Sequence, residues 1–402
     1  MVLKIQTQVT IVGQGYVGLP LAIAAAQSGY KVFGFDNDDA RIQSLKSGKS
    51  PIEDVSDKDL KNQIDKNNYE PTTDTSSISK SEVVLICVPT PLTKDRKPDL
   101  EVLISATTTV ANHIRPGTLV VIESTIAPGT CRNTLLPLVL RESNLKLVDF
   151  DLAYSPERID PTNSQWGIKN TPKLISGLTE EACIRSHIFY SKFIDTIFKC
   201  SSLEVAESAK LLENAFRFIN ISFINELSTY FFEIGVNANE VIAAASTKPY
   251  GFMQFFPGVG VGGHCIPVDS LYLSTAAKSI GVPLGFIELA SKINDQMPEY
   301  FISKAEKILG GLKGRNILVV GIAYKPNVSD VRESPAVVLI EGLRSKGAIV
   351  SWHDNLVKTW NAENSVPLNS GYDLAVIATS HSNVDLTKLG FVTILDSRNP
   401  IP

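Results

Sequence analysis

Cysteine and histidine are scarce in this chain of 402 residues, and both residue types are scattered along it. There are five cysteines and five histidines, and no CxxC pair is present. This spacing excludes a disulfide-rich secreted scaffold, and it gives no set of ligands for a metal ion. We therefore expect no metal site and a reducing, cytoplasmic location.

The sequence also lacks a strong charge excess and a long hydrophobic run. Its formal net charge is −4, so an anionic ligand must be met by a local cluster of basic residues. The apolar stretch over residues 3–27 resembles a signal peptide in part, but glycines and Pro20 interrupt it, and it is too broken to span a membrane. Neither a nucleic acid nor a membrane is expected as a partner.

Those interrupting glycines form a nucleotide-binding pattern. The stretch "VTIVGQGYVGLPLAIAAAQSGYKVFGFDND" predicts strand, glycine turn, helix and strand, with Gly13, Gly15 and Gly18 as G-x-G-x-x-G. These glycines allow a tight turn, a close approach of a pyrophosphate, and close packing of helix on strand. Asp36 ends the second strand, where its carboxylate accepts ribose hydroxyls and repels a 2′-phosphate. The pattern predicts NAD as the cofactor, rather than NADP.

Two further strands are predicted in "EVVLICVPTPL" and "TLVVIEST". Ligands bind at the carboxyl ends of parallel strands, so Thr90, Glu123 and Thr125 are expected to face the cofactor crevice. Glu157 follows another strand in "SPER". Its carboxylate is either a solvated loop charge or an acid of the site.

A long helix is predicted over residues 200–234, which contain no glycine or proline. Its apolar residues fall on nearly every face, which is typical of a helix buried between domains and against a second subunit. A homodimer is therefore expected. Lys210 and Asn214 are four residues apart and share one face. Lys210 either extends its amine to solvent or projects a cation beside the amide of Asn214 into a cleft.

The C-terminal region repeats the alternation of strand and helix without the glycine pattern. Its loops carry Lys325, Arg332 and Arg398, which suit a diphosphate. The predicted fold class is α/β, with two Rossmann-like doubly wound parallel-sheet domains joined by a long central helix. The expected domains are 1–199 for NAD binding, 200–300 as a central helical domain, and 301–402 for a second ligand.

The stretch "GVGVGGHCIPVD" over residues 258–269 places Cys265 in a glycine-rich loop. Glycines leave flexible backbone that a ligand can approach closely. Cys265 is either a reactive thiol or an ordinary packed or surface thiol.

The ordered motifs "GQGYVGLPLA", "VPTPL", "EST", "SPER", "AKLLENAFR", "GVGGHCIPVD" and "GIAYKPNVSDVRESP" cover essentially the whole chain. In these motifs and their order, the chain resembles the UDP-glucose/GDP-mannose 6-dehydrogenase family. Within the family it is most similar to the branch that oxidises UDP-N-acetylhexosamines, UDP-N-acetylglucosamine above all. The resemblance implies that C6 is oxidised from alcohol to carboxylate, with two NAD⁺ consumed, for polysaccharide biosynthesis.

By the same resemblance, Cys265 is the nucleophile that adds to the intermediate aldehyde and then carries a thioester. Lys210 and Asn214 match the pair that stabilises the alkoxide and oxyanion. Asp269 matches the acid that handles protons with Lys210.

Two more catalytic assignments follow from the resemblance. Glu157 matches the candidate base for thioester hydrolysis, and Thr125 matches the threonine near the nicotinamide and the catalytic water.

The resemblance also implies two sets of binding residues. The NAD set is Gly13, Gly15, Tyr16, Val17, Gly18, Asp36, Arg41, Thr90, Thr125 and Arg332. The UDP-sugar set is Glu157, Arg158, Lys210, Asn214, Tyr250, Gly262, Lys325 and Arg398.

His264 and Val268 stand where relatives that use UDP-glucose often carry Ser and Lys. A different substituent at C2 of the sugar is the simplest interpretation. His264 is either a base that lowers the pKa of Cys265 or a residue that only shapes the site. The family also leads us to expect a helix after "LDSRNPIP".

Three other functions remain open. A single-step hydroxyacid dehydrogenase would leave the second α/β domain and Cys265 unexplained. A sugar epimerase would use Tyr-x-x-x-Lys, a spacing found at Tyr300 and Lys304, although this pair is expected on a helix surface. A non-catalytic NAD sensor is the third. The yield of NADH per sugar separates all of them from the four-electron reaction.

Overall fold

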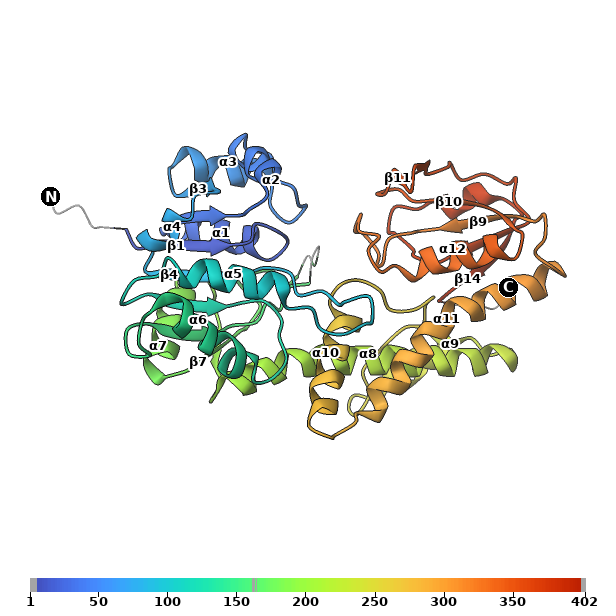
Figure 1. Cartoon of the computed structure of the whole chain (residues 1–402). Coiled ribbons are helices and arrows are strands. Elements are labelled where there is room, and N and C mark those ends of the chain that lie inside the picture. Colours follow the sequence, from blue (N-terminus) through green and yellow to red (C-terminus); the bar gives the residue numbers. More distant parts are fainter. Residues whose placement is uncertain (1–5, 161–162, 164, 399–402) are drawn as a thin grey trace. The chain divides into compact units, whose positions relative to one another are not determined.

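The computed structural model describes residues 6–160, 163 and 165–398 of the chain. These fall into two compact units, which divide between Leu212 and Glu213 (Figure 1).

The first unit is built on an eight-stranded sheet with the order β3-β2-β1-β4-β5-β6-β7-β8. Its strands are β1 (Gln8–Val12), β2 (Lys31–Phe35), β3 (Tyr69–Thr72), β4 (Val83–Ile86), β5 (Leu119–Ile122), β6 (Asp151–Tyr154), β7 (Lys173–Gly177) and β8 (Ile197–Lys199). The central strands β4 and β5 read VVLI and LVVI, and all their residues are buried. Such continuous β-branched runs are typical of parallel strands that are covered on both faces.

Helices cover both faces of this sheet. They are α1 (Gly18–Gln27), α2 (Asp39–Lys46), α3 (Asp57–Asp65), α4 (Ser76–Lys80), α5 (Glu101–Ala111), α6 (Leu136–Ser143) and α7 (Glu180–Tyr190), with a π-helical turn at Cys131–Leu135. Side chains of α1, α3 and α7 pack in one core with Val9 and Leu85, and those of α5 and α6 pack in another with Val84. The predicted doubly wound arrangement is confirmed.

The last two strands of the sheet run opposite to the others, since β8 is parallel to β7. β7 pairs antiparallel with β6, through Ala153–Gly177 and Tyr154–Ser176. A parallel connection needs a crossover, usually a helix, whereas antiparallel neighbours do not. The chain therefore re-enters the sheet at the edge where β6 ends, and Lys173, the first residue of β7, lies at that edge.

The predicted long helix is confirmed as α8 (Leu203–Glu233), which has 31 residues and ends before Gly235. The helix crosses the boundary between the two units. In the second unit it presents Phe216, Phe223 and Tyr230 at intervals of seven residues, and these side chains are 47%, 52% and 59% exposed. The expectation that its apolar faces are covered is therefore not met within this single chain.

The second unit continues with α9 (Ala238–Ser246), α10 (Ile266–Ser279), α11 (Gly285–Leu309) and a smaller Rossmann-like lobe. That lobe holds a four-stranded sheet of order β10-β9-β13-β14, and all its neighbouring strands are parallel. Its elements are β9 (Asn316–Val320), α12 (Pro335–Ser345), β10 (Ile349–His353), β13 (Leu374–Ile377) and β14 (Thr393–Asp396), with a hairpin of β11 (Thr359–Trp360) and β12 (Glu363–Asn364) and a 3₁₀ turn at Leu386–Leu389. The second predicted Rossmann-like domain is confirmed.

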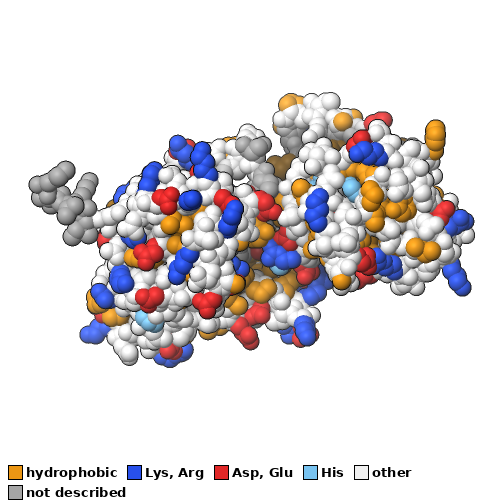
Figure 2. Space-filling model, turned by 90° about the horizontal axis from the view of Figure 1, so that it is seen from above, with side chains coloured by type: hydrophobic (Ala, Val, Ile, Leu, Met, Phe, Trp, Pro, Cys, Tyr) orange, Lys and Arg blue, Asp and Glu red, His pale blue; other side chains and the backbone are white. Residues whose placement is uncertain are grey.

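The charge distribution on the surface and the hydropathy of the helices are relevant to nucleic-acid and membrane partners. On the face drawn in Figure 2, acidic and basic side chains are interspersed over the N-terminal unit, without a basic stripe. Among the described residues, no helix is both long enough and apolar enough to cross a membrane.

Candidate functional site

The glycine turn after β1 has the geometry that the sequence predicts. Gly13 has φ of +91°, and a methyl group on it would lie 2.6 Å from the Cys87 carbonyl oxygen. A methyl group on Gly18 would lie 1.8 Å from the Gly13 carbonyl oxygen, whereas one on Gly15 would meet no atom within 4 Å. Gly13 and Gly18 therefore permit the turn, and Gly15 leaves the backbone open to an incoming phosphate.

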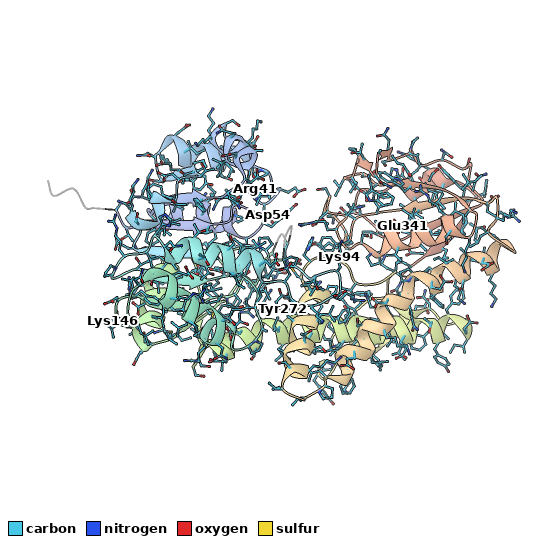
Figure 3. The ribbon with its side chains drawn as sticks, in the orientation of Figure 1. Arg41, Asp54, Lys94, Lys146, Tyr272 and Glu341 are labelled. Atoms are coloured by element: carbon cyan, nitrogen blue, oxygen red, sulfur yellow. The ribbon has the colours of Figure 1, made fainter. Side chains whose placement is uncertain are left out.

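Asp36 follows β2 and is buried beside this turn. Its Oδ2 accepts the Gln14 N–H at 2.8 Å and an Arg41 N–H at 3.0 Å. Its Oδ1 accepts the Asp38 N–H at 3.0 Å. Figure 3 shows Arg41 on α2 and Asp54 in the segment that follows that helix. The open Gly15, the helix that starts at Gly18 and the fixed acid at the strand end fit NAD.

Tyr16 and Val17, the other two predicted cofactor residues of the turn, line a small cavity. This cavity also contacts Asp54 and Glu157. Both sides of it belong to the first unit, so the glycine turn and the loop of Glu157 are neighbours there.

Thr90 and Thr125 come together at the carboxyl ends of neighbouring strands β4 and β5. The Thr90 hydroxyl donates to the Thr125 carbonyl oxygen at 2.8 Å. Glu123, only two residues before Thr125, points elsewhere: it is 1% exposed and pairs with Lys173 at 2.6 Å. The expectation that Glu123 faces a crevice is wrong, because its charge is buried against an amine from β7.

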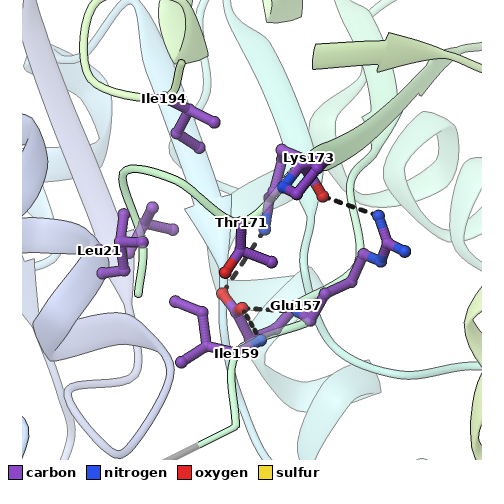
Figure 4. A pocket seen from close by; sticks show the side chains of 9 residues that line it. Leu21, Glu157, Ile159, Thr171, Lys173 and Ile194 are labelled. Atoms are coloured by element: carbon purple, nitrogen blue, oxygen red, sulfur yellow. Dashed lines mark hydrogen bonds and ion pairs between the residues drawn. The ribbon is translucent and has the colours of Figure 1, made fainter. Parts of the chain in front are cut away.

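Glu157 lies three residues after β6, in a pocket that Lys173, Thr171 and Arg158 also line (Figure 4). Its Oε1 accepts the N–H groups of Arg158 and Ile159 at 2.6 and 2.7 Å. Its Oε2 lies 3.5 Å from the Lys173 amine. Arg158 donates to the Pro172 carbonyl oxygen at 2.7 Å. Glu157 is therefore a fixed carboxylate, and not a mobile solvated loop charge.

Lys210 and Asn214 lie one turn apart on α8. Lys210 is 9% exposed, so it does not extend its amine freely into solvent. Asn214 donates its side-chain N–H to Asp269 Oδ2 at 2.5 Å. Two of the predicted catalytic residues, Asn214 and Asp269, are thus in direct contact within the second unit.

Cys265 is exposed and caps the N-terminus of α10, and its carbonyl oxygen accepts the Asp269 N–H at 2.8 Å. The first turn of a helix carries unsatisfied N–H donors and a positive dipole end, which favour a thiolate. Asp269, one turn later, is 3% exposed. Figure 3 labels Tyr272 further along the same helix.

The glycines before Cys265 are needed for close packing against the C-terminal lobe. A methyl group on Gly262 would lie 2.3 Å from the Glu333 carbonyl oxygen, and one on Gly263 would lie 2.7 Å from the Tyr324 ring. By contrast, a methyl group on Gly258 would meet nothing within 4 Å. The loop of Cys265 is therefore tightly held at its last two glycines.

Two buried asparagines hold the same loop, and the sequence analysis missed both. Asn225 of α8 accepts the Gly258 N–H at 2.9 Å. Asn294 of α11 accepts the Val261 N–H at 2.6 Å and donates to the Val261 carbonyl oxygen at 3.1 Å. Their only sequence signal is an amide on the apolar face of a helix, and that signal does not identify the backbone they bind.

The remaining predicted binding residues belong to the second unit. Arg332 pairs with Asp330 at 2.6 Å, Arg398 lies 4.0 Å from Asp396 just after β14, and Lys325 is half-buried in the loop after β9. Tyr250 is 72% exposed. Partial desolvation and the nearby Arg332 guanidinium lower the pKa of His264, so its ring is neutral near neutral pH.

The structure joins none of the five cysteines in a disulfide. Within the described residues, no group of three or more His, Cys, Asp or Glu side chains is arranged to hold a metal ion.

Three domain models of one protein family match most of the chain, in the order of the domains described above. Residues 7–195 match the NAD binding domain of the UDP-glucose/GDP-mannose dehydrogenase family. Residues 204–296 match its central domain, and residues 318–400 match its UDP binding domain. The chain belongs to this family, and it is an NAD-dependent UDP-sugar dehydrogenase.

The individual relatives are named for different UDP-sugars. The chain is 38% identical to protein CapL of Staphylococcus aureus, over 86% of this chain and 81% of that protein. It is 33% identical to a UDP-N-acetyl-D-glucosamine 6-dehydrogenase of Pseudomonas aeruginosa, over 93% of this chain and 90% of that one. The solved structure of a UDP-D-ManNAc dehydrogenase from Pyrococcus horikoshii superposes with a TM-score of 0.90 at 33% identity, covering 98% of this chain and 96% of that one.

Proposed function

We propose that the chain oxidises C6 of a UDP-N-acetylhexosamine, with UDP-N-acetylglucosamine favoured, to the uronic acid in two successive oxidations. The observation that carries this proposal is the arrangement of Cys265, Asp269 and Asn214 in the second unit. An exposed Cys265 caps α10, and Asp269 follows one turn later in contact with Asn214 at 2.5 Å. A single-step alcohol oxidation has no use for such a thiol.

The thiol matters because an aldehyde is a poor donor of hydride. Addition of the Cys265 thiolate gives a thiohemiacetal, whose oxyanion expels a hydride and leaves a thioester on the sulfur. Bound NAD⁺ supplies the hydride acceptor in both oxidations. Water then cleaves the thioester, so that one alcohol and one water give one carboxylate, two NADH and three protons.

The other catalytic residues have charge-handling roles in this proposal. Lys210 and Asn214 stabilise the developing alkoxide and oxyanion, and Asp269 orients the Asn214 amide through their hydrogen bond. Glu157 is the base for thioester hydrolysis, with Thr125 near the nicotinamide. Residues 1–199 bind NAD, residues 200–300 carry the catalytic loop, and residues 301–402 bind UDP through Lys325 and Arg398.

The preference for one sugar rests on fewer residues than the assignment of the reaction. His264 and Val268 flank Cys265 and Asp269, where Ser and Lys are common in UDP-glucose enzymes. The named relatives include enzymes for UDP-N-acetylglucosamine and for UDP-N-acetylmannosamine, and both sugars carry an acetamido group at C2. UDP-N-acetylmannosamine, UDP-N-acetylgalactosamine and UDP-glucose are therefore the alternatives. We also propose a cytoplasmic location, which the five free cysteines support.

The yield of NADH tests this function directly. With limiting UDP-N-acetylglucosamine and excess NAD⁺, the absorbance of NADH is expected to rise by two equivalents per sugar. The three alternative sugars are run in parallel as controls for specificity. One equivalent would indicate a single-step dehydrogenase. None with any of the four sugars would contradict the proposal and favour an epimerase or a sensor.

A homodimer is proposed from the exposed apolar side chains Phe216, Phe223 and Tyr230 of α8, spaced by seven residues. Light scattering on the purified chain is expected to give twice the mass of 43.7 kDa. Phe223→Asp places a charge in the centre of this stripe and is expected to give monomers. Phe391→Asp, which changes a fully exposed aromatic in the C-terminal lobe, is the control. A monomeric wild type would contradict the dimer.

A further inference from the structure

A buried ion pair of Lys173 and Glu123 lies next to the Glu157 carboxylate. Lys173 places its amine 2.6 Å from Glu123 Oε2 and 3.5 Å from Glu157 Oε2. The side chains of Lys173 and Glu123 are 6% and 0% exposed. Tyr190, itself fully buried, donates its hydroxyl to the other oxygen of Glu123. No role in the reaction has been given to these three residues above.

The fold explains how these groups meet. Glu123 follows β5 and Glu157 follows β6, so both lie at the carboxyl edge of the parallel strands. β7 runs antiparallel to β6, and it therefore begins at this same edge. Lys173 is its first residue. The reversed strand β7 thus places a cation at the edge where the two acids lie.

The contacts of Glu157 leave its carboxylate little freedom. Two backbone N–H groups bind Oε1 at 2.6 and 2.7 Å, while Lys173 faces Oε2. On the remaining side is a cavity of about 10 Å³, room for roughly one water molecule. The Thr171 hydroxyl points toward this carboxylate (Figure 4), and its buried oxygen has no hydrogen-bond partner among the described residues.

We propose that Lys173 is a positioning residue for Glu157: it holds the carboxylate in one orientation, so that the carboxylate can act as the base in thioester hydrolysis. Glu123 and Tyr190 hold Lys173 in turn. This inference rests on the proposed function, since it assigns a supporting residue to one step of that reaction.

Charge balance supports this arrangement. Lys173 is one cation shared between two carboxylates, and the other titratable groups beside it are Cys87 and Tyr190. Burial raises the pKa of Glu123 to about 7, against the opposite effect of Lys173. Burial also raises the pKa of the Cys87 thiol, which therefore stays neutral. Loss of the amine would remove the cation that Glu123 and Glu157 share, and would leave the guanidinium of Arg158, which donates to the Pro172 carbonyl oxygen, as the cation that lines the pocket with Glu157.

The test separates the chemical steps in rapid-mixing experiments with UDP-N-acetylglucosamine and NAD⁺. Lys173→Met removes the cation, and Lys173→Arg retains it. Because Lys173→Met alone leaves Glu123 buried without its partner, the double variant Lys173→Met/Glu123→Gln removes both charges together. Lys199→Met, an exposed lysine on the adjacent strand β8, is the matched control. Intact-protein mass spectrometry after an acid quench detects sugar bound to Cys265.

In both variants without the cation, the first two NADH per active site are expected at nearly the wild-type rate. Steady-state turnover is expected to fall at least tenfold, with the acyl adduct accumulating on Cys265 and the KM for NAD⁺ unchanged. Lys173→Arg restores turnover, and Lys199→Met behaves as wild type.

Two results would overturn the role of Lys173. One is wild-type turnover in Lys173→Met. The other is an equal slowing of every step in the double variant, with weaker NAD⁺ binding, since that is the signature of a purely structural pair. A wild type that forms no acid from any of the four sugars contradicts the proposed function instead, so the two failures are distinct.

Discussion

Cys265→Ala is expected to abolish formation of the uronic acid, with a fall in turnover of at least roughly 10³-fold. Cys265 is the exposed thiol at the N-terminus of α10, and no other group that we describe replaces it as a nucleophile toward the aldehyde. NADH release and uronic acid are both measured, the second by chromatography. Acid formation at the wild-type rate would show that the nucleophile is wrongly assigned.

The serine variant is the informative companion to this change. Cys265→Ser is expected to form an ester in place of the thioester, and esters hydrolyse more slowly, so an adduct of the sugar on Ser should be detected by intact-protein mass spectrometry. Cys183→Ala is the matched control, because this half-buried thiol lies on α7 in the first unit. It is expected to leave the two NADH per sugar unchanged.

Gly262→Ala is expected to lower kcat by about 10²-fold, because it displaces the loop that presents Cys265. Its new methyl group would lie 2.3 Å from the Glu333 carbonyl oxygen, so the backbone of one segment must move. Such overpacking costs roughly 1–3 kcal/mol of folding free energy. NAD⁺ binding is expected to persist, since the glycine turn of Gly13 belongs to the other unit.

Gly258→Ala is the control, since it adds the same methyl group to the same loop where nothing lies within 4 Å. Steady-state kinetics and a thermal melt on both variants give the comparison. Equal kinetics for Gly258→Ala and Gly262→Ala would contradict the idea that tight packing of this loop positions the thiol.

Much of the fold could be predicted from local sequence patterns. The helix α8 follows from 31 residues without glycine or proline, and the glycine turn follows from the spacing of Gly13, Gly15 and Gly18. Both signals are local, because propensity and periodicity act over one or two turns of chain. The second Rossmann-like lobe was predictable for the same reason.

The side-chain contacts inside the site could not be predicted from the sequence in the same way. Glu123 was expected at a crevice, but its partner Lys173 is 50 residues away in sequence and arrives on a strand whose direction the sequence does not reveal. Likewise, Asn294 binds the backbone of Val261, and a backbone group carries no residue type to recognise. Side-chain contacts between distant segments depend on tertiary packing, which a single sequence does not encode as a pattern.

The continuity of α8 has a consequence for how such an enzyme can vary. The helix passes through the boundary between Leu212 and Glu213, so Lys210 is counted with one unit and Asn214 with the other. Four residues of helix fix their separation along the axis at about 6 Å. Hinge bending, loop insertions or exchange of the sugar-recognition loops therefore leave this spacing unaltered, provided that the helix stays unbroken. Substrate range can therefore change while the spacing of Lys210 and Asn214, the pair proposed to stabilise the oxyanion, is retained.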